Sequence, residues 1–168
     1  MSAGALRVRP AAKVNLHLEV LGRRPDGYHE LRTLLQSLDL RDELVVAAAP
    51  EGTLELTVEP AGAAPADGRN LVLRAAERLR TAAGRPLGAR LRLVKRIPTG
   101  GGLGGGSADA AAALVALDRL WDLGLERHRL VRLGAELGAD VPFFLHGGLA
   151  LGIGRGDEVY PLRDLPPA

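Results

Sequence analysis

Glycine dominates the segment from residue 98 to residue 107, PTGGGLGGGS, in which six of the seven residues 100–106 are Gly. A residue without a Cβ lets backbone N–H groups turn inward and approach an anion closely, and a following helix adds the positive end of its dipole. The pattern therefore predicts a phosphate-binding loop between a strand and a helix that begins at Ser107. The alternative is a tight connection that needs only a positive φ, which one or two glycines would satisfy.

Two common phosphate loops fit this segment poorly. The spacing Gly100-x-Gly102-x-x-Gly105 satisfies the dinucleotide fingerprint, but that fold also needs a second strand with an acidic residue at its end about 20 residues later. Here an alanine-rich helical pattern is followed by another helical pattern. A Walker A loop would continue into Gly-Lys-Ser/Thr, and no Lys follows these glycines. The loop is therefore predicted to be of another kind.

Two residue types are rare enough to be informative. Of the 22 basic residues only Lys13 and Lys95 are lysine, and Asn15 and Asn70 are the only asparagines. In a chain that uses Arg elsewhere, a retained Lys suggests a site that needs a compact ammonium, although two lysines could also survive by chance. Lys13 and Asn15 stand two residues apart in a strand pattern, so their side chains should lie side by side. For Lys95, a surface cation near phosphate and a phosphate ligand are equally open interpretations.

The hydropathy pattern predicts an α+β fold. Residues 12–21 alternate apolar and polar side chains with a period of two, which is typical of a strand. Further strands are expected over 31–40, 43–48, 53–58 and 89–97. Helices are expected from the cap Asn70 to Gly84, over 108–121 and over 130–137, and residues 140–144 are expected to start a final strand region. Strands crowd the first half and two helices follow one another later, which favours α+β over a regular βαβ alternation.

Composition excludes several classes of protein. A formal charge of +2 and 3% aromatic residues do not provide the basic stripe with stacking platforms of a nucleic-acid binder. The absence of cysteine excludes disulfides, thiol nucleophiles and thiolate metal sites. No apolar run approaches the roughly 18 residues of a membrane span, and the N-terminus lacks the apolar region of a signal peptide. We therefore expect one domain of a soluble cytoplasmic protein that binds neither nucleic acid nor membrane.

Residues 98–107 resemble the phosphate loop of the GHMP kinase superfamily of small-molecule kinases. Residues 12–16 (AKVNL) with 24–30 (RPDGYHE), and residues 138–144 (GADVPFF), resemble the branch that phosphorylates 4-diphosphocytidyl-2-C-methyl-D-erythritol in the non-mevalonate isoprenoid pathway. The resemblance implies transfer of phosphate from ATP, with Mg²⁺, to the 2-hydroxyl of that substrate. It also implies that residues 1–168 form a GHMP kinase N-terminal ATP-binding domain, a mixed β-sheet packed against helices with a Gly-rich phosphate loop.

The resemblance also implies roles for individual residues. Lys13 and Asp140 would be the catalytic pair. Asn15, Tyr28 and His29 would line the substrate pocket, with Tyr28 near the cytidine and His29 at its base edge. The residues expected around ATP, from the adenosine end to the triphosphate, are Asn70, Leu71, Pro98, Thr99, Gly100, Gly101, Gly102, Leu103, Gly104, Gly105, Gly106, Ser107 and Ala108. No residue is assigned as a metal ligand, because Mg²⁺ would bridge the phosphates.

These residue types suit phosphoryl transfer to an alcohol. The reaction asks mainly for positioning and charge stabilisation, with a carboxylate to accept the hydroxyl proton. Asp140 would accept that proton, and the Lys13 ammonium would help to neutralise the transferring group, where an arginine would be bulkier and planar. Plainer alternatives stay open: Asp140 as a turn residue that bonds its own backbone, and Tyr28 and His29 as a solvated hairpin tip.

The chain departs from the family pattern in its loop and in its length. The loop ends Ser107-Ala108-Asp109 where the family usually has two consecutive serines, and one lost hydrogen bond of about 1 kcal/mol weakens such a site without abolishing it. Asp109 opposes a bound phosphate, so a cation is expected beside it. Related enzymes continue into a C-terminal domain that is absent here. We therefore expect a truncated chain that exposes apolar surface, turns over weakly or not at all alone, and depends on the missing domain or on association.

Two other functions remain open from the sequence. One is a truncated or degenerate nucleotide-binding module that binds ATP without independent turnover. The other is a sister GHMP kinase that acts on mevalonate or homoserine, which the segment Asp-Gly-Tyr-His at residues 26–29 disfavours.

Overall fold

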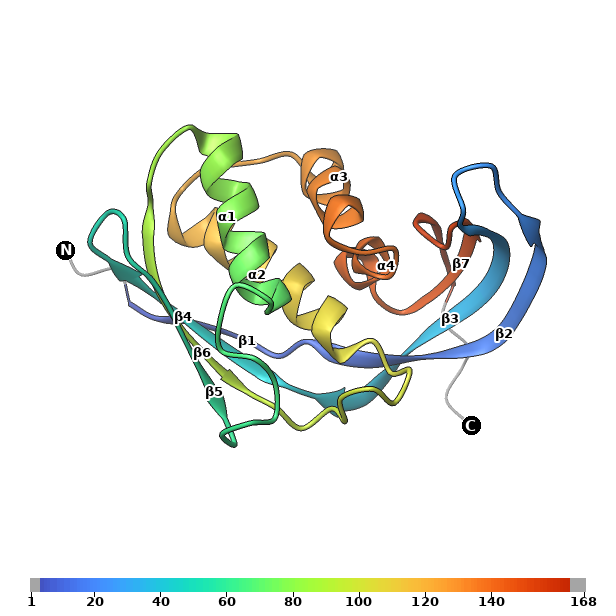
Figure 1. Cartoon of the computed structure of the whole chain (residues 1–168), viewed down its shortest axis with the longest axis horizontal. Helices are drawn as coiled ribbons and strands as arrows, with labels where there is room; N and C mark the ends of the chain where they lie inside the picture. Colours follow the sequence, from blue (N-terminus) through green and yellow to red (C-terminus); the bar gives the residue numbers. More distant parts are fainter. Residues whose placement is uncertain (1–3, 164–168) are drawn as a thin grey trace.

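Residues 4–163 are described by a computed structural model, in which two four-stranded sheets carry four helices on one side (Figure 1). The first sheet has the order β1-β4-β6-β5, and only β5 and β6 run parallel in it. The second sheet, β2-β3-β7-β8, is antiparallel throughout. The predicted α+β class is therefore confirmed.

The observed elements follow the predicted ones closely along most of the chain. The strands are β1 (Leu6–Val8), β2 (Ala11–Arg23), β3 (His29–Arg41), β4 (Glu43–Ala49), β5 (Leu54–Glu59), β6 (Gly88–Val94), β7 (Leu149–Gly154) and β8 (Glu158–Leu162). The helices are α1 (Leu71–Ala83), α2 (Gly105–Leu120), α3 (Arg127–Leu137) and α4 (Val141–His146). The long hairpin of β2 and β3 extends away from the helices at one end of the molecule (Figure 1).

The main core lies between the first sheet and the helices α1 and α2. Its members from β4 and β6 alternate along each strand, and they pack against apolar residues of the two helices: Leu44, Val46, Leu91, Leu93, Val72, Leu79, Leu114 and Leu117. Five alanines of α2 are also buried, so the backbone of α2 packs closely against its neighbours. This packing fixes α2, and with it the loop that precedes α2.

Helix α1 begins and ends as its sequence predicts. Asn70 is the N-cap, and its Oδ1 accepts a hydrogen bond of 2.9 Å from the N–H of Val72. Its amide nitrogen donates to the carbonyl of Pro65 at 2.6 Å, which ties the preceding loop to the helix. Gly84 ends the helix in the left-handed conformation, with φ of 64°.

Two segments differ from the prediction. Helix α2 begins at Gly105, with Gly104 as N-cap, so the last glycines of the loop form its first turn and the expected start at Ser107 is two residues late. The segment from Asp140 to Phe144 does not begin a strand: Val141–His146 form α4, with Asp140 at the N-cap and Pro142 in the first turn. A short apolar run fits a buried helix as well as a buried strand, which is why periodicity misassigned it.

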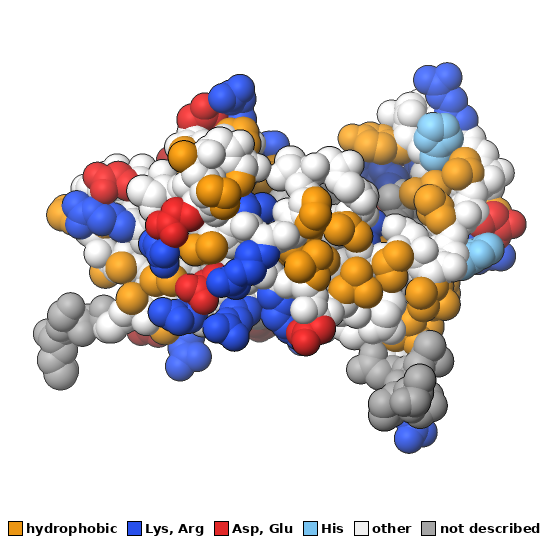
Figure 2. Space-filling view, turned by 90° about the horizontal axis from the view of Figure 1, so that it is seen from below, with side chains coloured by type: hydrophobic (Ala, Val, Ile, Leu, Met, Phe, Trp, Pro, Cys, Tyr) orange, Lys and Arg blue, Asp and Glu red, His pale blue; other side chains and the backbone are white. Residues whose placement is uncertain are grey.

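The far part of β2 leaves the core. Register shifts interrupt its pairing with β3, and Leu16, Leu18 and Val20 are each more than half exposed, so the apolar face of the predicted strand does not join the core. Hydrophobic side chains accordingly gather over the half of the molecule that contains β2 and β3 in Figure 2, and charged side chains gather over the other half. Within residues 4–163, no helix has the length and hydrophobicity to cross a membrane.

Candidate active site

The glycine loop between β6 and α2 forms a concave cradle. Gly100, Gly102 and Gly104 have φ of +80°, +71° and +70°, a conformation that side chains rarely adopt. A Cβ at Gly104 would lie 2.6 Å from the ring of Phe144, and one at Gly105 would lie 2.9 Å from Ile97. The first N–H groups of a helix have no partner within the helix, so the start of α2 offers donors to an anion. The loop therefore fits a group of phosphate type.

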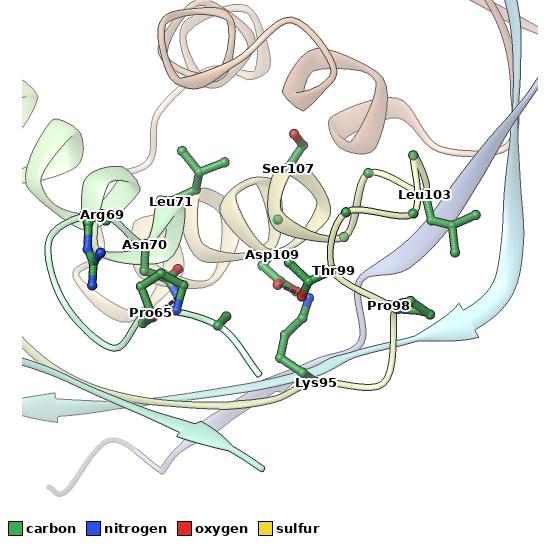
Figure 3. A pocket seen from close by; sticks show the side chains of 17 residues that line it. Pro65, Arg69, Asn70, Leu71, Lys95, Pro98, Thr99, Leu103, Ser107 and Asp109 are labelled. Atoms are coloured by element: carbon green, nitrogen blue, oxygen red, sulfur yellow. Dashed lines mark hydrogen bonds and ion pairs between the residues drawn. The ribbon is translucent and has the colours of Figure 1, made fainter. Parts of the chain in front are cut away.

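A cavity of about 300 Å³ lies beneath this loop (Figure 3). It is lined by Ala64, Pro65, Arg69, Asn70, Leu71, Lys95, Asp109 and the loop residues 98–107. All the residues expected around ATP except Ala108 therefore share one cavity. Ala108 is buried on another side of α2 and borders a different cavity, with Phe144 and Ser37.

Lys13 and Asp140 lie together beside the loop although 127 positions separate them in the chain. The Lys13 Nζ is 3.4 Å from the Asp140 Oδ2, with the lysine side chain buried and the carboxylate 41% exposed. The Lys13 N–H donates to the carbonyl of Leu103 at 3.0 Å, and a Cβ at Gly104 would lie 3.1 Å from the Lys13 Cγ. An ammonium and a carboxylate thus border the cradle that would hold a phosphate.

A chain of hydrogen bonds orients the Lys13 ammonium. Its Nζ donates to the Asn15 Oδ1 at 2.6 Å, and the Asn15 amide nitrogen donates to the Thr33 Oγ1 at 2.7 Å. The Thr33 hydroxyl then donates to the backbone carbonyl of His17 at 2.8 Å. Lys13 and Asn15 do lie side by side, as predicted. The role of Asn15 in this structure is to fix the ammonium.

Tyr28 and His29 lie away from this pair, at the tip of the β2–β3 hairpin. Tyr28 is 55% exposed, and its N–H donates to the Asp26 Oδ1 at 3.1 Å. His29 is the exposed first residue of β3. The structure therefore divides the expected site into a centre at Lys13, Asp140 and the loop, and a distal part at the hairpin tip.

Lys95, Asp42 and Asp109 form a buried charged cluster beneath the loop. The Lys95 Nζ donates hydrogen bonds to the Asp42 Oδ2 and, at 2.7 Å, to the Asp109 Oδ2. Figure 3 shows Lys95 rising toward Asp109, and the lysine side chain is only 6% exposed, so Lys95 is no surface cation. It is the cation that was expected beside Asp109. Asp42, which no sequence pattern singles out, also accepts the N–H groups of Arg96 and Ile97.

Burial and the neighbouring charges shift the pKa values of Asp109 and Lys95 in this cluster. Burial raises the pKa of Asp109 to about 7, against the opposing attraction of Lys95, and the Asp109 Oδ1 is buried with no hydrogen-bond partner within residues 4–163. Burial lowers the pKa of Lys95, but the adjacent Asp109 and Asp42 carboxylates outweigh this effect and raise it overall. Lys95 therefore stays charged, and Asp109 titrates near neutral pH.

Comparisons with known proteins agree with this geometry. The profile of the GHMP kinases N terminal domain matches residues 70–148. A 4-diphosphocytidyl-2-C-methyl-D-erythritol kinase of Salinispora arenicola (strain CNS-205) is 52% identical over 164 residues, which cover 98% of this chain and 52% of that relative. Residues 70–148 therefore match a GHMP kinase N-terminal domain, and the fold of the chain is that of such a domain.

Solved structures of two kinases share the fold of this chain. The crystal structure of a 4-(cytidine 5'-diphospho)-2C-methyl-D-erythritol kinase aligns with a TM-score of 0.76 at 46% identity, over 94% of this chain and 55% of that one. The mevalonate kinase of Methanococcus jannaschii shares the fold, with a TM-score of 0.73 at 13% identity over 95% of this chain and 56% of that one. The chain spans about half the length of the curated relatives it matches.

Substitution of Gly104 tests the cradle. In Gly104→Ala the methyl group meets Phe144 and Lys13, whereas in Gly100→Ala, also at positive φ, it meets open space. Because overpacking costs about 1–3 kcal/mol, the free energy of unfolding should fall by that much more in Gly104→Ala, and ATP affinity should fall with it. Denaturant unfolding and calorimetric titration measure both. Equal effects of the two variants would contradict the close packing of the loop.

The Asp109 carboxyl should make stability depend on pH. Because its pKa is raised in the folded protein, the folded state binds this proton more tightly than the unfolded chain. The bound proton contributes at most about 4 kcal/mol to the free energy of unfolding. This contribution is complete below about pH 4 and is lost as the pH rises through about 7. In Asp109→Asn this loss disappears, so the variant should gain stability relative to wild type between pH 5 and pH 8. Parallel pH profiles of the unfolding free energy would refute the assignment.

Proposed function

We propose that this GHMP kinase domain transfers the γ-phosphoryl group of ATP to the 2-hydroxyl of 4-diphosphocytidyl-2-C-methyl-D-erythritol. The observation that carries the proposal is the Lys13–Asp140 pair, 3.4 Å apart beside a glycine cradle. Similarity along nearly the whole chain to kinases named for this substrate supports the choice of acceptor.

Each part of the site would take one task in the transfer. The acceptor oxygen forms its bond to the γ-phosphorus as the bond to the β-phosphate oxygen breaks, and ADP leaves. Asp140, the more exposed partner of the pair, accepts the proton of the attacking hydroxyl. The Lys13 ammonium and the loop N–H groups stabilise the charge on the transferring group. Mg²⁺ would neutralise phosphate charge in the same cradle, held through the phosphates.

Two alternatives predict different behaviour. A nucleotide-binding module without turnover would bind ATP but release no ADP when the acceptor is added. A sister kinase would prefer mevalonate or homoserine. The mevalonate and homoserine kinases of similar fold are 13–23% identical to this chain, a level at which the likeness extends to the fold alone. Competition between these alcohols and the diphosphocytidyl substrate separates the two kinases.

The whole reaction is proposed to need a second lobe. Residues 1–168 would be the N-terminal ATP-binding domain, and the exposed apolar side chains of β2 and β8, among them Leu18, Val20 and Leu162, offer surface for a further domain or an associated chain. Cytoplasmic localisation is part of the same proposal, because ATP and the acceptor would be drawn from that compartment.

Substitution of Asp140 tests the assignment of the base. In Asp140→Asn the side chain keeps its shape but cannot accept the proton, so the transfer rate should fall by about 10²–10⁴-fold. Single-turnover transfer from γ-labelled ATP, with enzyme in excess, detects even slow chemistry, and ATP affinity serves as the control. A variant that retains substantial transfer with unchanged binding would remove Asp140 as the base.

Turnover of the 168-residue chain alone should be weak or absent. A coupled assay of ADP release, with and without the diphosphocytidyl substrate, measures it. Turnover at the rate of a full-length relative assayed in parallel would contradict the need for a second lobe.

A further inference from the structure

The buried cluster of Asp42, Lys95 and Asp109 has one more carboxylate than it has ammonium groups. Its three side chains are 0%, 6% and 3% exposed, and Lys95 and Asp42 are the charged groups that act on Asp109. A buried charge without a full set of partners is costly, and two carboxylates that share a site favour the uptake of a proton. With one bound proton the cluster is neutral, and without that proton it keeps one net negative charge.

The hydrogen bonds of the cluster show which atom can hold this proton. The Asp42 Oδ1 accepts the N–H groups of Arg96 and Ile97, and its Oδ2 accepts from Lys95, so both of its oxygens are engaged as acceptors. Asp109 accepts from Lys95 through Oδ2 at 2.7 Å, whereas its Oδ1 is buried with no partner within residues 4–163. A proton on the Asp109 Oδ1 therefore displaces no existing hydrogen bond.

The cluster lies directly under the start of α2. A Cβ at Gly105, the first residue of this helix, would lie 3.1 Å from the Lys95 Nζ. Lys95 and Asp109 line the same cavity as the glycine loop, and their side chains meet there (Figure 3). Because the first N–H groups of α2 are the donors offered to a phosphate, the charge of the cluster acts on an anion that the loop holds.

The other charged groups around the loop are paired one to one. Arg69, from the segment before α1, lines the cavity and is paired with Asp67 at 2.8 Å. On the other side of the loop, Lys13 is paired with Asp140 at 3.4 Å. Each of these cations thus has one counter-ion, whereas the buried cluster has two carboxylates for one cation.

We propose that binding of a nucleotide phosphate in the glycine loop is coupled to the uptake of a proton by the Asp109 Oδ1. The proton comes from solvent and the Lys95 ammonium stays charged, so the cluster becomes neutral and no longer repels the phosphate. The inference goes beyond the proposed function and rests on it only for the identity of the nucleotide. Asp109 acts through its charge and touches no reacting atom.

The direction of the effect follows from the charges. Burial gives Asp109 a pKa of about 7 in the free domain, and a phosphate held next to it raises this pKa further. Below about pH 6 the carboxyl group is protonated with or without nucleotide, so the nucleotide affinity is constant there. As the pH rises through about 7, the free domain loses the proton that the complex retains, and the nucleotide affinity falls.

Calorimetric titration with ATP at about pH 6 and about pH 8, without Mg²⁺, tests the coupling. Asp109→Asn keeps the shape of the side chain without its charge, so the ratio of wild-type to variant affinity cancels the titration of ATP itself. Between the two pH values this ratio should fall about three- to tenfold. Asp122→Asn is the matched control: it removes a carboxylate just beyond the far end of α2, where the φ of 51° also suits asparagine, and its affinity should follow that of wild type.

A count of protons tests the same coupling by a second measurement. The heat of ATP binding is compared in two buffers of different ionisation enthalpy at about pH 7.5, which gives the number of protons taken up on binding. Wild type and Asp122→Asn should each take up roughly half a proton more than Asp109→Asn.

The outcomes separate this inference from the proposed function. An affinity ratio that is constant or rises between the two pH values, or equal proton uptake in wild type and Asp109→Asn, overturns the coupling even if phosphoryl transfer is observed. A ratio that falls, with proton uptake reduced in Asp109→Asn and not in Asp122→Asn, supports the coupling even if the chain alone transfers no phosphate.

Discussion

The rest of the site depends on the interactions that hold the buried ammonium of Lys13 in place. A buried lysine loses its hydration, so the fold must supply both hydrogen-bond acceptors and a counter-charge. Asn15 supplies the acceptor, Asp140 supplies the charge, and the backbone of Lys13 is bonded to Leu103 in the glycine loop. One residue thereby joins the second sheet, the start of α4 and the phosphate cradle.

The Asp42–Lys95–Asp109 cluster holds the glycine loop in place from beneath, and Lys13 holds it at its edge. Asp42 holds the backbone of Arg96 and Ile97 as β6 gives way to the loop, and Asp109 belongs to the second turn of α2. Lys95 connects the two carboxylates and so fixes both ends of the loop relative to each other. Because the cluster is buried beside the cavity under the glycine loop, protonation of Asp109 changes both the free energy of unfolding and the charge next to that cavity.

The sequence predicted the features that depend on residues close together in the chain. These features are the glycine loop, the strand 12–21, the Asn70 cap and the adjacent side chains of Lys13 and Asn15. The helix at Val141–His146 was missed because its short apolar run fits two kinds of buried element. The burial of Lys95 was missed because its carboxylate partners lie 53 and 14 positions away, in elements that only the tertiary fold brings together.

A crystal structure of the domain with a non-hydrolysable ATP analogue and the diphosphocytidyl acceptor tests the central claim most directly. The account predicts the Lys13 Nζ within about 3.2 Å of a γ-phosphate oxygen and an Asp140 oxygen within the same distance of the 2-hydroxyl. A complex with the γ-phosphate in the glycine cradle but with either side chain turned away from its partner would contradict it.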